Sequence, residues 1–365
     1  MARLAFEPWG NYSLALAASV ECLGVEPWTS SSTTPEVLRL GVEATPDSAC
    51  LSFKACTGHF VKAAQEGVEY GAMVNSTGTC RLRYYHLLQR QILRERGLRL
   101  FVFNVGYDGL KPPIVRHFDP DLPHFLQCCL RARLKVLTVD AIEGAAWRTR
   151  ARELEPGATT RVMKQCLQEL GQARTTRQIR AVRRRVGERF GTVSLAAGRS
   201  PLRVGLLGEA AVLRNRFLNH NLEEILGSLG VVPRNFFLLG EEIKNIFGVG
   251  LWSRHSRFTL KRLARPYLRS PVGGHAVESV GNAVACAREG YDGLIHVCPT
   301  GCMPEISVRP IIRKIGRDLD IPVLECSFDE HTSHVGVITR VEAFVDVMEQ
   351  RRLRSGHHGK NGSSA

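Results

Sequence analysis

The sequence predicts an α/β protein with two Rossmann-like lobes of parallel sheet, joined by a helical middle segment. Apolar runs typical of strands alternate with helical patterns in the first and last thirds of the chain, while the middle third loses the strand pattern. The two outer thirds also share an internal repeat. We expect lobes at 1–120 and 200–353, a helical, Arg-rich connection at 121–199 and a disordered tail at 354–365.

In the first lobe, short apolar runs and amphipathic segments follow one another closely. They predict a strand at 4–6, a helix at 12–24, a helix at 53–66, a strand at 70–75, a helix at 82–96 and a strand at 98–105. Such βαβ alternation is typical of a parallel sheet with helices on its faces.

The rest of the chain repeats this alternation after a helical interval. Helices are predicted around 121–134 and 140–190, with a break at 155–160, where the sequence reads EPGATT. The second lobe is then predicted to contain a strand at 202–207, helices at 214–229, 275–289, 304–318 and 340–352, and strands at 293–298 and 321–327. The region 233–272, rich in Pro, Arg and Phe, gives no clear prediction.

Composition indicates a soluble globular protein, with 44% hydrophobic and 23% charged residues. No apolar run approaches the roughly 18 residues of a membrane span. The N-terminal apolar residues are interrupted by Glu7, Pro8 and Gly10, which fits a signal peptide poorly. We therefore expect a cytoplasmic protein, in which the 11 cysteines serve as buried thiols, as metal or cluster ligands, or in redox chemistry.

The net charge of +14 is concentrated in the middle of the chain, at 147–191. A solvated Arg-rich helical surface explains such a charge excess without any ligand. Nucleic-acid binding is unlikely, because no aromatic residues are interleaved with the arginines and no recognition motif is present. An acidic partner protein or a phosphorylated ligand would account for the charge equally well.

The repeat relates GHFVKAAQEGVEYGAMVNSTGTC at 58–80 to GNAVACAREGYDGLIHVCPTGC at 281–302. Each copy opens with Gly, passes through Glu-Gly and ends in Cys, and a single-residue indel separates the copies. Nine positions separate Gly71 from Cys80, and the same spacing separates Gly293 from Cys302. The matched helix, strand and turn predict a duplicated lobe.

Cys80 and Cys302 each follow a predicted strand and precede a predicted helix, which is where open α/β sheets bind ligands. Cys50 stands in a turn before the helix at 53–66. Two lobes that face each other could bring these three thiols to one point. Three thiolates are too few for a closed structural zinc site but suit a 4Fe–4S cluster with one open iron. A turn cysteine without a role remains the alternative, and Cys298, His59 and Glu305 are candidates to complete a site.

Several of these segments resemble the iron–sulfur family related to the 2-hydroxyacyl-CoA dehydratase subunits, whose members are often called CoA protein activases or CoA-substrate-specific enzyme activase-related proteins. The resemblance covers roughly 1–110 and 200–350. The segments are TPDSACLSFKACTGHFVKA, TGTCRLRYY, GGHAVESVG, YDGLIHVCPTGCMPE and IPVLECSFDEHTSHVGVITRVEAFVDV.

The resemblance implies two Rossmann-like lobes with a cluster between them, and it places Cys50, Cys80 and Cys302 at the cluster-ligand positions. It also implies a partner, an ATP-dependent activator of the sugar-kinase/actin type that delivers electrons. Relatives of this kind act on 2-hydroxyacyl-CoA, so an acyl-CoA or another small molecule is the implied substrate. Thr77 stands where the family commonly has a cysteine, which favours one simple cluster over a double-cubane cluster.

Further polar residues follow the strand at 321–327, on the same predicted sheet edge as Cys302. Glu330, His331 and Arg340, together with Glu305, are candidates for positioning substrate or moving protons, although a loop that anchors the last helix would explain the first three as well. The turn Gly205-Leu-Leu-Gly-Glu209 after the strand at 202–207 hints at a phosphate-binding turn without a known motif.

The sequence thus predicts an iron–sulfur redox protein of 2-hydroxyacyl-CoA dehydratase type, with one 4Fe–4S cluster between two lobes. The alternative is a non-catalytic accessory or scaffold subunit of an activator/dehydratase system, which would dock through the basic middle segment.

Overall fold

The computed structural model describes residues 1–28, 33–74, 79–105, 113–198, 200–246 and 255–358. It contains two four-stranded sheets in which every strand pairing is parallel. The first sheet has the order β2-β1-β3-β4, with β1 (Arg3–Phe6), β2 (Glu26–Pro27), β3 (Tyr70–Val74) and β4 (Phe101–Val105). The second has the same order, β6-β5-β7-β8, with β5 (Leu202–Gly208), β6 (Val231–Asn235), β7 (Gly293–Val297) and β8 (Val323–Cys326). The predicted fold class of two Rossmann-like lobes is confirmed.

Helices surround the first sheet in nearly the predicted order. They are η1 (Gly10–Tyr12), α1 (Ser13–Glu21), α2 (Pro35–Ala44), α3 (Leu51–Gln65), η2 (Arg81–Tyr84), α4 (Tyr85–Glu95) and α5 (Pro113–Phe118). The helix α2 and the strand β2 were not predicted from the sequence. The start of α2 is well defined, because Thr34 accepts a hydrogen bond from the backbone N–H of Val37 at 3.2 Å and Pro35 occupies the first turn.

The second lobe departs from prediction at one helix. Its helices are α9 (Ala210–Arg214), α10 (Leu222–Ser228), α11 (Leu239–Ile246), α12 (Arg257–Ala264), α13 (Ala276–Arg288), α14 (Met303–Asp318) and α15 (His334–His358). The single helix predicted at 214–229 is wrong, because His220 and Asn221 have φ angles of 55° and 58° and interrupt it. Residues 354–358 continue α15, so the predicted disordered tail starts too early, and 359–365 lie outside the described residues.

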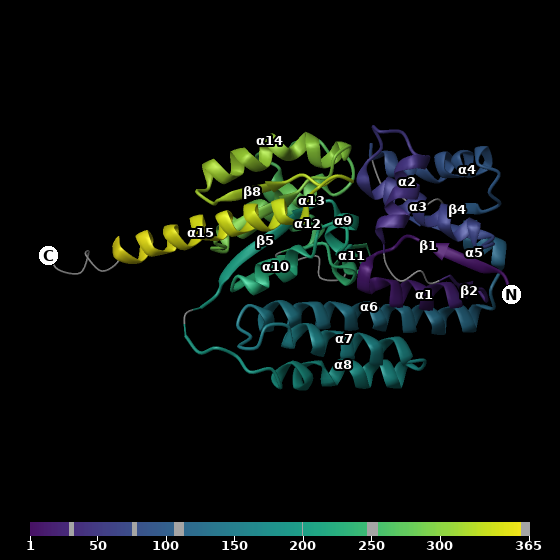
Figure 1. The fold of residues 1–365 in the computed structure, drawn as a ribbon, viewed down its shortest axis with the longest axis horizontal. Helices are drawn as coiled ribbons and strands as arrows, with labels where there is room; N and C mark the ends of the chain where they lie inside the picture. The colour runs from purple at the N-terminus through teal and green to yellow at the C-terminus, as the bar shows by residue number, and fades with distance from the viewer. Residues whose placement is uncertain (29–32, 75–78, 106–112, 199, 247–254, 359–365) are drawn as a thin grey trace.

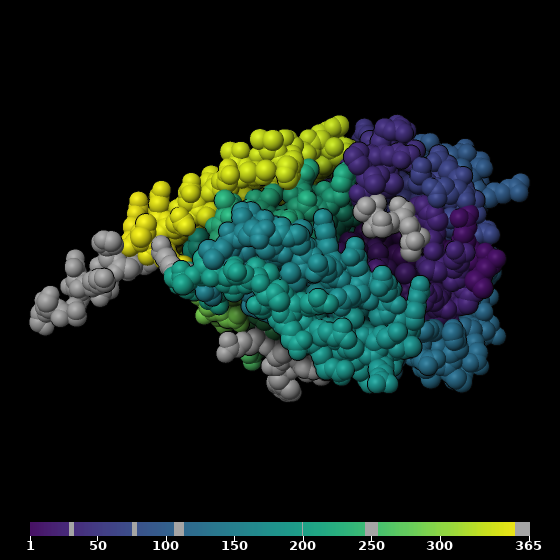
Figure 2. Space-filling model, turned by 60° about the horizontal axis from the view of Figure 1, so that its bottom comes forward, coloured from purple at the N-terminus to yellow at the C-terminus, as the bar shows by residue number. Residues whose placement is uncertain are grey.

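The middle segment forms three helices, α6 (Leu122–Arg150), α7 (Ala158–Gln172) and α8 (Thr176–Gly191). These helices lie along one side of the molecule, beneath both lobes (Figure 1), and α7 and α8 cover much of the face seen in Figure 2. The helix α6 contacts α1 of the first lobe and β6, α10 and α11 of the second. No helix in the described part of the chain is long and apolar enough to cross a membrane.

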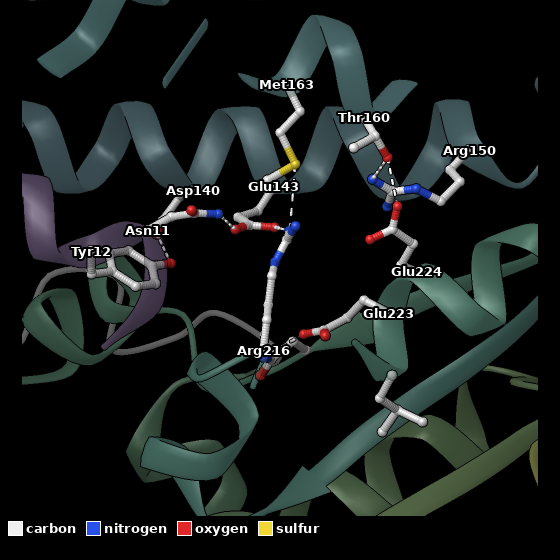
Figure 3. Close-up of polar contacts among 12 residues, drawn as sticks. Asn11, Tyr12, Asp140, Glu143, Arg150, Thr160, Met163, Arg216, Glu223 and Glu224 are labelled. Carbon is white, nitrogen blue, oxygen red and sulfur yellow. Dashed lines mark hydrogen bonds and ion pairs between the residues drawn. The ribbon is translucent and has the colours of Figure 1, made fainter. Parts of the chain in front are cut away.

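A polar network fixes α6 to both lobes (Figure 3). Glu143 of α6 accepts a hydrogen bond from Asn11 Nδ2 at 2.6 Å and pairs with Arg216 of the second lobe at 2.9 Å. Nearby, Tyr12 donates to Asp140 of α6 at 2.5 Å. One glutamate therefore links the first lobe, the helical segment and the second lobe.

Gly58 and Gly281, the first residues of the two repeat copies, each lie where two helices cross closely. A Cβ on Gly58 of α3 would lie 1.9 Å from the carbonyl oxygen of Val37 in α2, and a Cβ on Gly281 of α13 would lie 2.5 Å from the carbonyl oxygen of Leu260 in α12. Both glycines let two helices cross in backbone contact. The sequence repeat thus marks equivalent helix crossings in the two lobes.

Replacing Gly281 with alanine is expected to lower the free energy of unfolding by about 2 kcal/mol, because the new methyl group forces α12 away from α13. Urea unfolding followed by circular dichroism measures this change. The control is Gly187→Ala in α8, where a Cβ meets nothing within 4 Å and the higher helix propensity of alanine should stabilise by up to about 1 kcal/mol. Equal effects of the two substitutions would contradict the close crossing.

Candidate functional site

The three turn cysteines predicted as ligands all occupy helix-capping positions. Cys50 is the N-cap residue of α3, Cys80 of η2 and Cys302 of α14, and each has an extended backbone. Helix N-caps are usually Ser, Thr, Asp or Asn, so three cysteines at such positions are unusual. Their thiols lie at helix starts, where partial positive charge favours an anion, although η2 is too short to contribute much.

The structure brings the three cysteine-bearing turns to one seam between the lobes. A Cβ on Gly301, which precedes Cys302, would lie 3.1 Å from the Cα of Cys50. A Cβ on Gly273 of the second lobe would lie 2.7 Å from the backbone nitrogen of Cys80. The positive φ angles of Gly301 (77°) and Gly273 (85°) suit glycine in these close approaches.

Side-chain hydrogen bonds hold the same seam together. Arg81 donates to the carbonyl oxygens of Ser48, at 3.2 Å, and of Gly301 in the other lobe. Thr79 Oγ1 donates to the carbonyl oxygen of Val272 at 2.7 Å. Arg81 thus binds backbone carbonyl groups of both lobes.

The thiols of these turns interact electrostatically. The Cys50 thiol interacts with the charges of both Cys80 and Cys302. Burial raises the pKa of Cys50 to about 11, despite the neighbouring Tyr85 hydroxyl at 3.4 Å, and burial also raises the pKa of Cys302. In the described residues, no group of three or more His, Cys, Asp or Glu side chains is arranged to hold a single metal ion.

The candidates for completing the cysteine site have other partners. Glu305 is buried and contacts His296 Nε2 at 2.9 Å and Ser279 Oγ at 3.3 Å. Cys298 is fully buried, and an interaction with Arg309 partly offsets the rise that burial causes in its pKa. His59 packs its ring edge-on against Trp28, and burial lowers the pKa of His59 to about 4.

The candidates after β8 divide into two groups. Glu330 forms an ion pair at 2.5 Å with Lys54 of α3, whose side chain is 4% exposed, and so ties the second lobe to the first. His331 and Arg340 are exposed, and Arg340 donates to the carbonyl oxygen of Glu325. The loop around Asp329 is therefore anchored to its own lobe and, through Glu330, to the other.

Two carboxylates that the sequence analysis had not proposed as site residues lie at this seam. Glu209 follows β5, and its Oε2 accepts hydrogen bonds from Ser52 Oγ of the first lobe at 2.8 Å and from the Val212 N–H at 2.7 Å. Its negative charge acts on both Cys50 and Cys302. The sequence hint of a phosphate-binding turn at 205–209 is therefore better explained by a carboxylate that caps α9 and contacts the other lobe.

Glu7 follows β1 and is the second of these carboxylates. It is 5% exposed, and desolvation by burial raises its pKa to about 7, a rise that the charge of Glu209 reinforces. Its Oε2 has no hydrogen-bond partner among the described residues. A buried carboxyl with a pKa near neutrality can give up or accept a proton at physiological pH.

A chain of charged side chains, of which Arg214 is buried, adjoins Glu7. Arg214, 3% exposed, pairs with Glu242 at 2.6 Å, and Glu242 pairs with His275 at 2.9 Å. Burial disfavours the charged form of Glu242, but Arg214 and His275 outweigh it and lower its pKa to about 2. Burial likewise lowers the pKa of His275, but Glu242 reverses this and raises it to about 9. The seam therefore combines thiols, carboxylates and cations from both lobes.

A comparison with known protein families found no matching family model, and a comparison with curated proteins found no match either. The fold and the seam thus define a two-lobed α/β protein whose candidate site lies between the lobes, beyond the carboxyl ends of β1 and β5.

Proposed function

We propose that the protein is an iron–sulfur redox protein of 2-hydroxyacyl-CoA dehydratase type, which binds one 4Fe–4S cluster at the seam through Cys50, Cys80 and Cys302. An ATP-dependent activator would supply its electrons in the cytoplasm, and an acyl-CoA or another small molecule would be the substrate. The observation that carries this proposal is the meeting of three capping cysteines from two lobes at one seam.

The donor set suits a cluster, in which each cysteine sulfur binds a different iron atom. Cys50 is an electrostatic neighbour of both Cys80 and Cys302, so the three thiols could serve one cluster. When bound, the cluster supplies one-electron transfer. The positive N-terminal ends of α3 and α14 would stabilise the thiolates of Cys50 and Cys302.

The remaining polar residues of the seam would bind substrate groups and handle protons. Glu7 can hold a proton near neutral pH, because its pKa is about 7. Arg214 carries positive charge beside it, and Glu242, which also pairs with His275, balances part of that charge. The Lys54–Glu330 ion pair holds the lobes together across the seam and so limits access of water.

The proposal is tested by anaerobic reconstitution of the full chain with iron and sulfide. About four iron and four sulfide ions per chain are expected, with the broad absorbance at roughly 400 nm of such clusters. Cys50→Ser, Cys80→Ser and Cys302→Ser should each lose most of the bound iron. Cys166→Ser, which alters a buried cysteine of α7, is the matched control and should retain it. Reconstituted protein without iron, or a triple serine variant that keeps it, would refute the proposal.

A non-catalytic role as a docking subunit is the second candidate, and the basic surface of α8 favours it. A groove of about 370 Å³ between α6 and α8 is lined by Leu134, Thr138, Ile179, Arg180, Arg183 and Arg184. If the protein only docks, Cys302→Ser should leave its binding to the activator unchanged, while Arg180→Glu with Arg183→Glu abolishes it. The redox role predicts that Cys302→Ser removes electron acceptance.

A further inference from the structure

Three arginines at the end of α12 surround a hollow on the surface of the second lobe. The hollow has a volume of about 490 Å³ and is lined by Arg262, Arg265, Pro266 and Arg269. Arg262 belongs to α12, Arg265 is its C-cap residue, and Arg269 follows four residues later. All three arginines are exposed, and they belong to the region 233–272, for which the sequence analysis made no clear prediction.

The fold holds these three side chains on one side of the chain. Their spacing of three and four residues places them on one face of a helical turn. The backbone N–H groups of Tyr267 and Leu268 donate to the Ala264 carbonyl oxygen at 2.9 and 2.8 Å, which continues the turn past Pro266. Leu260 and Ala264, on the opposite face, are buried where α12 packs against α13. The arginine face is therefore directed away from the core of the lobe.

The charge of the three arginines is not neutralised by the protein. Among the described residues, none of the three forms an ion pair with a carboxylate. Two carboxylates of neighbouring helices have other partners, since Glu278 of α13 pairs with Arg257 at 3.1 Å and Asp318 of α14 pairs with Lys314 at 2.7 Å. Three positive charges around one hollow repel one another, and an anion that contacts all three relieves this repulsion.

The lining of the hollow defines the chemistry of its ligand. Guanidinium groups bind phosphate oxygens through pairs of parallel hydrogen bonds. A single phosphate group carries at most about two negative charges, fewer than the three positive charges present. The volume also lies in the range of about 300–1,000 Å³ that is typical of small-molecule sites. Among the described residues, no aromatic side chain lines the hollow, so the phosphates would be the part of the ligand that is recognised.

We propose that Arg262, Arg265 and Arg269 bind a small molecule that carries two or more linked phosphate groups. The three guanidinium groups would hold the phosphate oxygens, and the rest of the ligand would face solvent. The site does not rest on the proposed cluster, because no cysteine belongs to it. The protein should therefore bind the ligand equally well before and after reconstitution with iron and sulfide.

Isothermal titration calorimetry of the full-length protein at about 0.15 M salt tests the proposal. Tripolyphosphate should occupy one site per chain and bind at least about tenfold more tightly than orthophosphate, because it adds charge-assisted hydrogen bonds. A comparison of ADP with pyrophosphate distinguishes a nucleotide from a free oligophosphate. Equal affinity would identify the linked phosphates alone as the ligand, and tighter binding of ADP would identify a nucleotide that carries them.

Substitutions of the arginines test the site itself. Arg262→Gln, Arg265→Gln and Arg269→Gln should each weaken tripolyphosphate binding about tenfold, because each removes a charged hydrogen-bond donor. The triple glutamine variant should bind none. Arg265→Lys keeps the charge and loses the planar fork of donors, so its affinity should lie between those of the natural sequence and Arg265→Gln.

The matched control is the triple glutamine variant of Arg180, Arg183 and Arg184, which line the groove between α6 and α8. It removes the same net charge and should leave tripolyphosphate binding unchanged. Circular dichroism shows that each variant is folded, which the exposure of these arginines leads us to expect.

Three results would overturn the proposal. They are the absence of saturable binding, orthophosphate binding as tight as that of tripolyphosphate, and an equal loss of binding in the control variant, which would mean that net charge alone attracts the anion. Tighter binding of a short DNA duplex than of tripolyphosphate, lost in the same Arg262, Arg265 and Arg269 variants, would assign the hollow to a nucleic-acid backbone instead.

Discussion

Replacing Arg214 with methionine is expected to lower the free energy of unfolding by about 2 kcal/mol, because it removes a buried guanidinium and leaves the partly exposed carboxylate of Glu242 with His275 as its remaining partner. Arg214 is 3% exposed, pairs with Glu242 at 2.6 Å and donates to the Phe237 carbonyl oxygen at 2.7 Å. Its guanidinium also lies 5.0 Å from the centre of the Trp9 ring, so the substitution removes an interlobe contact as well. Urea unfolding at pH 7 measures the loss.

Two further variants separate the buried charge from the loss of packing. Combining Arg214→Met with Glu242→Leu removes both members of the pair and should recover about half of the lost stability. Arg313→Met is the surface control, since Arg313 is 56% exposed in its pair with Glu325 and its replacement should change the stability very little. A double variant as unstable as Arg214→Met would show that the Glu242 carboxylate is not the cause.

Replacing Glu7 with glutamine is expected to stabilise the protein at pH 8 by up to about 3 kcal/mol and to have little effect at pH 4. Burial raises the pKa of Glu7 from 4.5 to about 7 in the folded state, so the folded protein binds this proton more tightly than the unfolded chain does. Below pH 4.5 both states hold the proton. Between about 4.5 and 7 the unfolded chain ionises first, and stability falls as pH rises.

The measurement is the free energy of unfolding of both proteins from pH 4 to pH 8. The difference between Glu7→Gln and the natural sequence should grow with pH across this window and then level off. Glu349→Gln, on an exposed part of α15, is the control and should leave the pH dependence unchanged. A constant difference at every pH would mean that Glu7 acts through packing alone.

The sequence predicted features that depend on local pattern. The repeat was detectable because Gly58 and Gly281 each allow two helices to cross closely and are therefore both glycine. It was also detectable because the spacing from Gly71 to Cys80 recurs from Gly293 to Cys302. Parallel strands and their flanking helices produce periodic apolar patterns that a single sequence shows directly. These patterns predicted the fold class, and they identified the turns that contain Cys80 and Cys302 as candidate sites.

Features that depend on tertiary contacts were missed. The strand β6 contains Pro233, which argues against a strand but is tolerated at the edge of the second sheet. Arg214, Glu242 and His275 are distant in sequence, and each alone has the pattern of a surface charge. Glu7 is a single acidic residue before a proline, and its pKa is shifted by burial in the fold and by Trp9, Glu209 and Arg214.

The continuous helix α6 has a mechanical consequence. Its 29 residues span about 44 Å and run beneath both lobes, touching α1 at one end and β6, α10 and α11 elsewhere (Figure 1). Because this continuous helix packs against both lobes, it allows them little independent rotation. Any wide opening of the seam must first detach α1 or break the contact between Arg216 and Glu143. A molecule that enters the seam should therefore do so through small movements of the turns, while the lobes keep their separation.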